Sequence, residues 1–134
     1  MSEGSNLLLV DDSDDDAFLF KRALARHPNV RLVGWAQDGD AAIAYLSGAD
    51  PYVDRRQYPW PDVMVLDLKM PRRDGYEVLK WMEGKSPRPK VAVFTSSDLE
   101  EDKRRVGELG ADLFQQKVFL PDELDRFIER LKSL

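Results

Sequence analysis

Five short apolar runs alternate along this chain with five longer stretches in which apolar and charged residues are mixed. Strands that alternate with helices in this way predict a parallel sheet with helices on both faces. The apolar runs show no strict alternation, which is typical of strands buried on both sides. We expect strands at 7–10, 30–36, 63–66, 91–94 and 113–114, and helices at 14–26, 41–47, 74–83, 98–109 and 121–131.

The length of the chain restricts how such a sheet can be built. With 134 residues the sequence has room for one domain and one sizeable core, whereas a closed eight-unit barrel needs far more chain. We therefore expect an α/β fold, an open three-layer, flavodoxin-like (βα)5 sandwich whose five-stranded parallel sheet has the order 2-1-3-4-5. The segment 48–61 holds three prolines and is expected to be irregular.

Composition excludes several classes of protein. The chain has no cysteine, which removes disulfides and thiolate metal sites. Its net charge of −5 argues against nucleic acid as a partner. No apolar run is long enough to cross a membrane, and the first residues do not form a signal peptide. We therefore expect a cytoplasmic domain with no membrane partner.

Carboxylates directly follow two of the expected strands. Asp11 and Asp12 come after 7–10, and Asp67 comes after 63–66. In the expected order these strands are neighbours at the switch point of the sheet, where open α/β folds bind ligands. Three carboxylates close together repel one another unless one is protonated or a cation binds. Ligands that are all oxygen indicate Mg²⁺, with Mn²⁺ as the alternative, rather than zinc.

A hydroxyl and an ammonium follow the fourth and fifth strands. Thr95 comes after 91–94, and Lys117 comes shortly after 113–114. The metal, the hydroxyl and the ammonium would each bind one oxygen of a phosphoryl group. Asp67 would then be placed for in-line attack as a carboxylate nucleophile.

Together these elements resemble the receiver domain of two-component response regulators. The resemblance extends from about Asn6 to Leu131, and its motifs are Asp11-Asp12, Asp67-x-x-Met70-Pro71-x-x-Asp74-Gly75, Thr95 and Lys117. It implies a single receiver domain over residues 1–134, without an output domain. It also implies that Asp67 accepts phosphate from a sensor histidine kinase or a phosphotransfer protein.

The resemblance assigns a metal site next to the acceptor. Asp12, Asp67 and the backbone carbonyl of Lys69 would bind Mg²⁺ directly, and Asp11 would act through water. By the same resemblance, Thr95 would bind oxygens of the phosphoryl group.

Lys117 would bind the phosphoryl oxygens as well, by the same resemblance. Phe114, three residues earlier, would be the aromatic switch that turns inward when Thr95 moves toward phosphate. Such a protein is a two-state signalling switch rather than an enzyme. Its own chemistry is at most self-phosphorylation and slow self-dephosphorylation.

The length of 48–61 narrows the resemblance to the single-domain regulators that accompany bacterial phytochrome histidine kinases. A bacteriophytochrome is therefore one candidate for the kinase. In this family the surface formed by 98–109, 113–114 and 121–131 often makes a homodimer, and we expect the same surface to be available here.

The first helix carries an aromatic residue on its outer side. One face is expected to hold Asp16, Leu19, Phe20, Ala23 and Leu24. Phe18 points the opposite way with Arg22 nearby, so we predict that Phe18 is exposed in the free protein and that both residues dock the kinase.

Other polar residues are expected to have structural roles alone. The acids at 14–16 lie in the first turn of the first helix, where the helix dipole favours negative charge. Ser97 or Asp98 is expected to cap the fourth helix. His27, which ends the first helix, is expected to be a solvated or helix-terminal residue rather than a phosphodonor.

Three other functions remain open. A Mg²⁺-dependent phosphohydrolase with an aspartate nucleophile needs a second acid two residues later, where this chain has Lys69. A flavodoxin-type FMN module needs a phosphate loop after the first strand, where Asp11 and Asp12 would repel the phosphate. A degenerate receiver regulated by partners alone is the third, because Val118 stands where the family usually has proline. We expect the Lys117–Val118 bond to be trans, since a non-proline cis bond costs about 2.5–4 kcal/mol.

Overall fold

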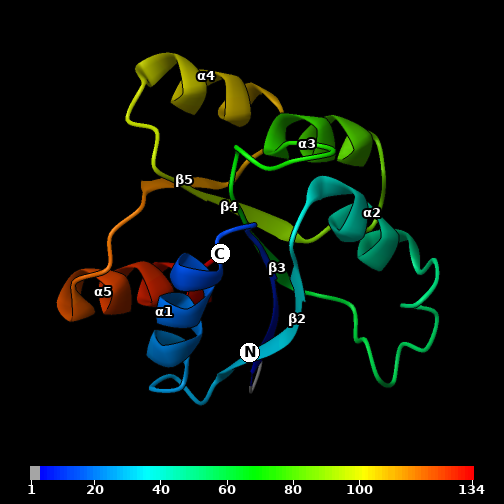
Figure 1. Ribbon diagram of the computed structural model, residues 1–134, viewed down its shortest axis with the longest axis horizontal. Coiled ribbons are helices and arrows are strands. Elements are labelled where there is room, and N and C mark those ends of the chain that lie inside the picture. The colour runs from blue at the N-terminus through cyan, green and yellow to red at the C-terminus, as the bar shows by residue number, and fades with distance from the viewer. Residues whose placement is uncertain (1–3) are drawn as a thin grey trace.

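The computed structural model describes residues 4–134, in which five parallel strands alternate with five helices (Figure 1). The strands are β1 (Ser5–Val10), β2 (Val30–Ala36), β3 (Val63–Leu66), β4 (Lys90–Thr95) and β5 (Leu113–Gln116). The helices are α1 (Asp14–Leu24), α2 (Gly39–Ser47), α3 (Gly75–Met82), α4 (Glu100–Glu108) and α5 (Pro121–Lys132). The sheet has the order β2-β1-β3-β4-β5. The predicted flavodoxin-like fold, including its strand order, is confirmed.

Alternate residues of β1 supply two separate cores, one on each face of the sheet. Leu7 and Leu9 pack in the core that contains residues of α1 and α5. Leu8 and Val10 pack in the core that contains residues of α2, α3 and α4. Figure 1 shows α1 and α5 lying together, away from the other three helices. Because all four side chains are at most 1% exposed, residues 7–10 of β1 appear in the sequence as an uninterrupted apolar run.

The expected boundaries are close to the observed ones, and the differences come from helix caps. Helix α1 ends at Leu24, two residues before the expected end. Helix α2 begins at Gly39 rather than at residue 41, because Asp38 is its N-cap and accepts a 2.7 Å hydrogen bond from the backbone N–H of Ala41.

The prediction that Ser97 or Asp98 caps α4 was wrong. Leu99 is the N-cap residue, and no side chain caps it. The hydroxyl of Ser97 instead accepts from the Leu99 N–H at 3.2 Å and donates to Asp102 in the first turn of α4 at 2.5 Å. Ser97 therefore ties the loop after β4 to α4 through a side chain of the helix.

The irregular segment 48–61 is held against α2 by an aromatic group. The rings of Tyr52 and Tyr58 lie 5.0 and 6.0 Å from the ring of Tyr45. The Tyr45 hydroxyl donates to the carbonyl of Pro59 at 2.8 Å, and Arg55 donates to the carbonyl of Leu46. The segment lacks regular structure, as expected, but its side chains fix it to the domain.

The outer side of α1 matches the sequence pattern only in part. Phe18 is 61% exposed, which confirms that prediction. The inner face, however, is formed by Ala17, Phe20, Ala23 and Leu24. Leu19 is 36% exposed, so its expected place on the buried face was wrong. The buried face is thus rotated by part of a turn from the expected one.

Of the two alternatives for His27, the solvated one was wrong, because the side chain is buried, whereas the residue does lie just after the end of α1. Its Nε2 lies 2.9 Å from Asp125 of α5, and its Nδ1 lies 3.5 Å from Glu129. Arg26 donates to the same Asp125 oxygen at 2.8 Å. The residues that follow α1 are therefore fastened to α5 by an ionic cluster.

Candidate phosphoacceptor site

Three acids meet at the carboxyl ends of β1 and β3. Val10 and Leu66 are partners in the register of these neighbouring strands, so the residues that follow them lie side by side. One oxygen from each of Asp11, Asp12 and Asp67 lies within 4.8 Å of the other two. Asp11 and Asp67 are buried and Asp12 is exposed. The donor set is all oxygen and open to solvent on one side, which fits a hard divalent cation such as Mg²⁺.

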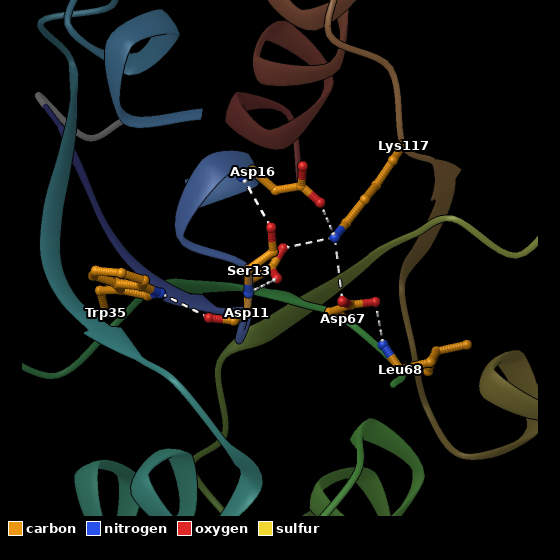
Figure 2. A network of polar contacts seen from close by, with 7 residues as sticks. All are labelled: Asp11, Ser13, Asp16, Trp35, Asp67, Leu68 and Lys117. Atoms are coloured by element: carbon orange, nitrogen blue, oxygen red, sulfur yellow. Dashed lines mark hydrogen bonds and ion pairs between the residues drawn. The ribbon is translucent and has the colours of Figure 1, made fainter. Parts of the chain in front are cut away.

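The ammonium of Lys117 lies against this acid cluster. Its Nζ is 2.8 Å from Asp11 and 3.2 Å from Asp67, and the Lys117 side chain is only 8% exposed (Figure 2). The chain after β5 is directed here by a 2.7 Å hydrogen bond from the Lys117 N–H to the Thr95 carbonyl. A buried cation is thus supplied by a residue that follows the edge strand of the sheet.

The two partners perturb each other's pKa. Burial raises the pKa of Asp11, an effect that the hydrogen bond to Lys117 only partly offsets. Burial alone would lower the pKa of Lys117, but its hydrogen bonds to Asp11 and Asp16 and the charge of Asp67 raise the pKa above its usual value. Lys117 therefore remains an ammonium at neutral pH.

The hydroxyl of Thr95 has no hydrogen-bond partner among residues 4–134. Thr95 ends β4, next to β3, and it is 1% exposed. Its Oγ1 is buried, and it is the unpartnered side-chain polar atom found in the described chain. Buried hydroxyls are normally paired, so this one marks a place where an acceptor group would be stabilised.

Trp35 and Ser13 orient Asp11. The indole N–H of Trp35 donates to the Asp11 backbone carbonyl at 2.8 Å, and the Ser13 N–H donates to its carboxylate at 2.9 Å (Figure 2). Neither residue was singled out from the sequence. Trp35 belongs to β2, so a metal at Asp11 would lie near an intrinsic fluorophore.

The loop between Asp67 and α3 is tightly packed. Asp67 accepts a 2.8 Å hydrogen bond from the N–H of Leu68, and Gly75 donates to the Leu68 carbonyl at 2.9 Å. Asp74 and Glu77 form a capping box that begins α3. The side chain of Lys69 is exposed, and the ligand role expected for its backbone carbonyl stays a prediction.

Three of the expected functional residues lie away from the acids. Phe114 is half-buried against the core of α2, α3 and α4, and its role as a switch stays a prediction. Phe18 and Arg22 are exposed on α1. Arg22 lines a shallow cavity of about 160 Å³ with Leu19 and Phe119. The docking role of α1 is likewise untested.

Asp16 is a site residue that the sequence did not reveal. It was expected only to load the first turn of α1, yet its Oδ2 lies 2.8 Å from Lys117 Nζ (Figure 2). A signal was present, because helical spacing puts this acid on the same face as Phe20 and Ala23. An acid on an otherwise apolar face needs a buried partner.

The peptide bond after Lys117 has the expected geometry. The cis peptide bonds of the described chain are Asp50–Pro51 and Ser86–Pro87, so the Lys117–Val118 bond is trans as predicted. No helix in residues 4–134 has the length and apolar character needed to span a bilayer.

A relative of known role covers most of the chain. The nitrate/nitrite response regulator protein NarL of Escherichia coli is 30% identical over 122 residues, which cover 91% of this chain and 52% of NarL. The chain thus spans about half the length of that relative.

Solved structures of response regulators are also similar to this chain, over nearly its full length. The phosphorylated cyanobacterial phytochrome response regulator RcpA superposes with a TM-score of 0.84 at 27% identity, covering 97% of this chain and 92% of RcpA. The bacteriophytochrome response regulator AtBRR has a TM-score of 0.77 at 33% identity, covering 99% of this chain and 96% of AtBRR. The family model of the response regulator receiver domain matches residues 7–129. The chain therefore belongs to the response regulator receiver domain family.

Proposed function

We propose that Asp67 accepts a phosphoryl group from a sensor histidine kinase or a phosphotransfer protein in a Mg²⁺-dependent reaction, and that the chain acts as a stand-alone phosphorelay switch. The observation that carries the proposal is the position of the buried Asp67 carboxylate. It lies beside two further acids that fit a divalent cation and 3.2 Å from the ammonium of Lys117.

The chemistry requires only a nucleophile and charge stabilisation. A carboxylate oxygen of Asp67 would attack the phosphorus of a phosphohistidine, the P–N bond would break, and the imidazole would leave with the electron pair and take up a proton. Lys117 and the unpartnered hydroxyl of Thr95 would bind phosphoryl oxygens as negative charge develops on them. Mg²⁺ or Mn²⁺ held by Asp11, Asp12 and Asp67, with the Lys69 carbonyl, would supply further positive charge.

The signal would leave the site through the loop after β4. Thr95 would move toward the phosphoryl group, and Phe114 of the adjacent strand β5 would turn into the space that Thr95 vacates. The hydroxyl of Ser97, two residues after Thr95, donates a hydrogen bond to Asp102 of α4. This contact supports the proposal that a movement of Thr95 would reach α4. The chain would then be a two-state switch whose equilibrium is set by one covalent anion.

The proposed partners act on different surfaces. Phe18 and Arg22 of α1 would contact the kinase, and the phytochrome regulators among the structural neighbours make a bacteriophytochrome the first kinase to test. The strand β5 is an edge strand, so α4, β5 and α5 would form the surface of a homodimer. A histidine kinase uses ATP, and the proposal therefore places the chain in the cytoplasm.

Acetyl phosphate with Mg²⁺ tests the acceptor directly. We expect intact-mass spectrometry to show the mass of one added phosphoryl group on the wild type and on Asp98→Asn, which removes an exposed acid that does not belong to the acid cluster. Asp67→Asn should show no adduct. An adduct that persists in Asp67→Asn would overturn the proposal, and continuous turnover of p-nitrophenyl phosphate would favour a phosphohydrolase instead.

The metal can be tested separately through Trp35. The other two tryptophans line one cavity, in which Trp60 comes before the amino end of β3 and Trp81 lies near the end of α3. We expect Mg²⁺ to change the fluorescence of the wild type with a saturable curve, and Trp35→Phe to lose that change. Asp12→Asn should weaken the apparent affinity, since it removes one ligand.

A further inference from the structure

Asp16 holds the ammonium of Lys117 from the side opposite the acceptor. Figure 2 shows Lys117 extended between Asp16 on one side and Asp67 on the other, with Asp11 next to both. The Asp16 oxygen lies 2.8 Å from Nζ, as close as that of Asp11 and closer than that of Asp67, which lies at 3.2 Å. Asp16 is not one of the three acids that meet around the candidate metal position.

The three acceptors match the three N–H donors of an ammonium. A phosphoryl group on Asp67 would need one of these donors. The contact with Asp67 is the longest of the three, and the phosphoryl group would be attached to that same side chain. The donor now directed at Asp67 is therefore the one that would pass to a phosphoryl oxygen, while the bond to Asp16 is kept.

A lysine in this position needs such an anchor. Its side chain has four rotatable bonds and about 2 kcal/mol of rotamer entropy, and Lys117 follows the short edge strand β5. Asp16 is itself fixed, because its N–H donates to the hydroxyl of Ser13, the N-cap of α1, at 3.2 Å. The cap of α1 thus fixes Asp16, and Asp16 fixes the end of Lys117.

We propose that Asp16 is a positioning residue for phosphoryl transfer, which holds the Lys117 ammonium so that one N–H points at the acceptor carboxylate. The inference rests on the proposed function of Asp67. It assigns a task to an acid that belongs neither to the metal cluster nor to the acceptor. The opposite possibility, that Asp16 competes with the phosphoryl group for Lys117, predicts the reverse change in rate.

The rate at which acetyl phosphate and Mg²⁺ phosphorylate Asp67 separates these two cases. In this reaction an Asp67 oxygen forms a bond to phosphorus, the acetyl O–P bond breaks, and acetate leaves. We expect Asp16→Ala to slow the reaction about tenfold, since a misplaced charge loses much of its effect on the transition state. Asp16→Asn keeps an acceptor oxygen, so its phosphorylation rate should lie between those of wild type and Asp16→Ala. Asp15→Ala removes the neighbouring exposed acid of the same turn and should react like wild type.

A double-mutant cycle shows whether Asp16 acts through Lys117. In a Lys117→Ala background, Asp16→Ala should cause no further slowing, because there is no ammonium left to position. Equal slowing in both backgrounds would mean a general structural effect and would overturn the inference. An unchanged or faster reaction of Asp16→Ala in the wild-type background would overturn it too.

The free protein offers a readout that does not depend on phosphorylation. Because the Lys117 ammonium is held by three carboxylates, we expect its ¹⁵Nζ signal to be visible by NMR in wild type and in Asp15→Ala. The signal should be lost by exchange with water in Asp16→Ala. Its persistence in that variant would overturn the inference. Absence of an Asp67 adduct in wild type, with the NMR signal still lost in Asp16→Ala, would overturn the proposed function and the role in phosphoryl transfer, and would leave only the anchoring of Lys117 by Asp16.

Discussion

A Cβ atom on residue 75 would lie 2.4 Å from the carbonyl oxygen of Asp67, so Gly75 and the backbone of the acceptor occupy space that no larger residue can share. The contact belongs to the first turn of α3, where the Gly75 N–H also donates to the Leu68 carbonyl. The glycine of the Asp74-Gly75 pair therefore has a steric cause, which lies at the acceptor itself.

Gly75→Ala should disturb the acceptor loop. We expect the free energy of unfolding to fall by about 1–3 kcal/mol, because backbone atoms must move to admit the methyl group. Urea denaturation measures the change. Gly107→Ala is the matched control in α4, where a Cβ meets nothing within 4 Å, and it should raise stability by about 0.5–1 kcal/mol. Equal effects of the two substitutions would contradict the steric argument.

Thr95→Val should separate stability from function. The hydroxyl is buried without a partner among the described residues, so its replacement by a methyl group should raise the free energy of unfolding by about 1 kcal/mol. Phosphorylation by acetyl phosphate should slow, whereas Thr95→Ser, which keeps the hydroxyl, should phosphorylate at nearly the wild-type rate. A marked loss of stability in Thr95→Val would show that the hydroxyl is satisfied in solution.

Tyr76 should titrate well above the ordinary pH range of tyrosine. Burial, then the hydrogen bond to Asp102 and the charge of that residue, raise the pKa of Tyr76 to about 12. A raised pKa means that the associated stability is fully present below the ordinary tyrosine value of about 10 and is lost as pH rises through the folded value. Absorbance of the phenolate during an alkaline titration measures this step.

Variants assign that step. Tyr76→Phe should remove the transition near pH 12, and Asp102→Asn should lower the pKa of Tyr76 without restoring the ordinary value, since burial remains. Glu101→Gln, an exposed neighbour in α4, should leave the titration unchanged. An unshifted transition in Asp102→Asn would contradict the assignment.

The ionic cluster between α1 and α5 should make stability depend on pH in the acid range. Hydrogen bonds from His27 and Arg26 lower the pKa of Asp125. A lowered pKa gives stability that is present above the ordinary carboxyl value and is lost as pH falls through the folded one. Asp125→Asn should therefore lower the urea midpoint at neutral pH, and the difference from wild type should shrink as the pH falls below the ordinary carboxyl value and through the lowered pKa of Asp125.

The control for this cluster is Asp98→Asn, which changes an exposed acid that forms no ion pair within residues 4–134. Its urea midpoint should follow that of the wild type at every pH. A difference between wild type and Asp125→Asn that stays constant down to acid pH would show that the ion pairs are not its source.

Phe18→Ala should affect one phosphodonor and not the other. With a bacteriophytochrome kinase that phosphorylates the wild type, we expect transfer to fall about tenfold, as for an aromatic residue buried in an interface. The rate with acetyl phosphate should not change, because this donor needs no docking surface. Val53→Ala, at a residue that is 62% exposed in the segment 48–61, should behave like wild type with both donors. Normal transfer from the kinase to Phe18→Ala would remove α1 from the docking surface.

The fold and the acid cluster could be predicted because both depend on local pattern and strand order. Apolar runs locate strands, and a parallel sheet brings the residues after Val10 and Leu66 to one edge whatever the details of packing. The register irregularity between β1 and β2, at Leu7 and Leu8, leaves no comparable mark in the sequence. This irregularity depends on how β1 and β2 pair with each other, and not on the sequence of either strand alone.

Asp16 and His27 were misjudged for a similar reason. Asp16 reaches Lys117 only because the cap at Ser13 sets the rotation of α1 and β5 delivers a residue 101 positions away. His27 is buried only because Asp125 of α5 packs over the end of α1. In both cases a polar side chain has a structural partner that is remote in the chain. Helical spacing can place Asp16 on the inner face, but it does not identify Lys117 as the partner.

The division of the interior into two cores bears on the timing of signalling. Helix α1, which carries Phe18, packs on one face of the sheet, and α4 packs on the other. Under the proposed function, α4 would therefore move without a direct packing contact to the core that holds α1. A kinase bound to α1 and a downstream target protein bound to α4 would then be able to occupy the same molecule at once. The target could bind the phosphorylated chain before the kinase dissociates.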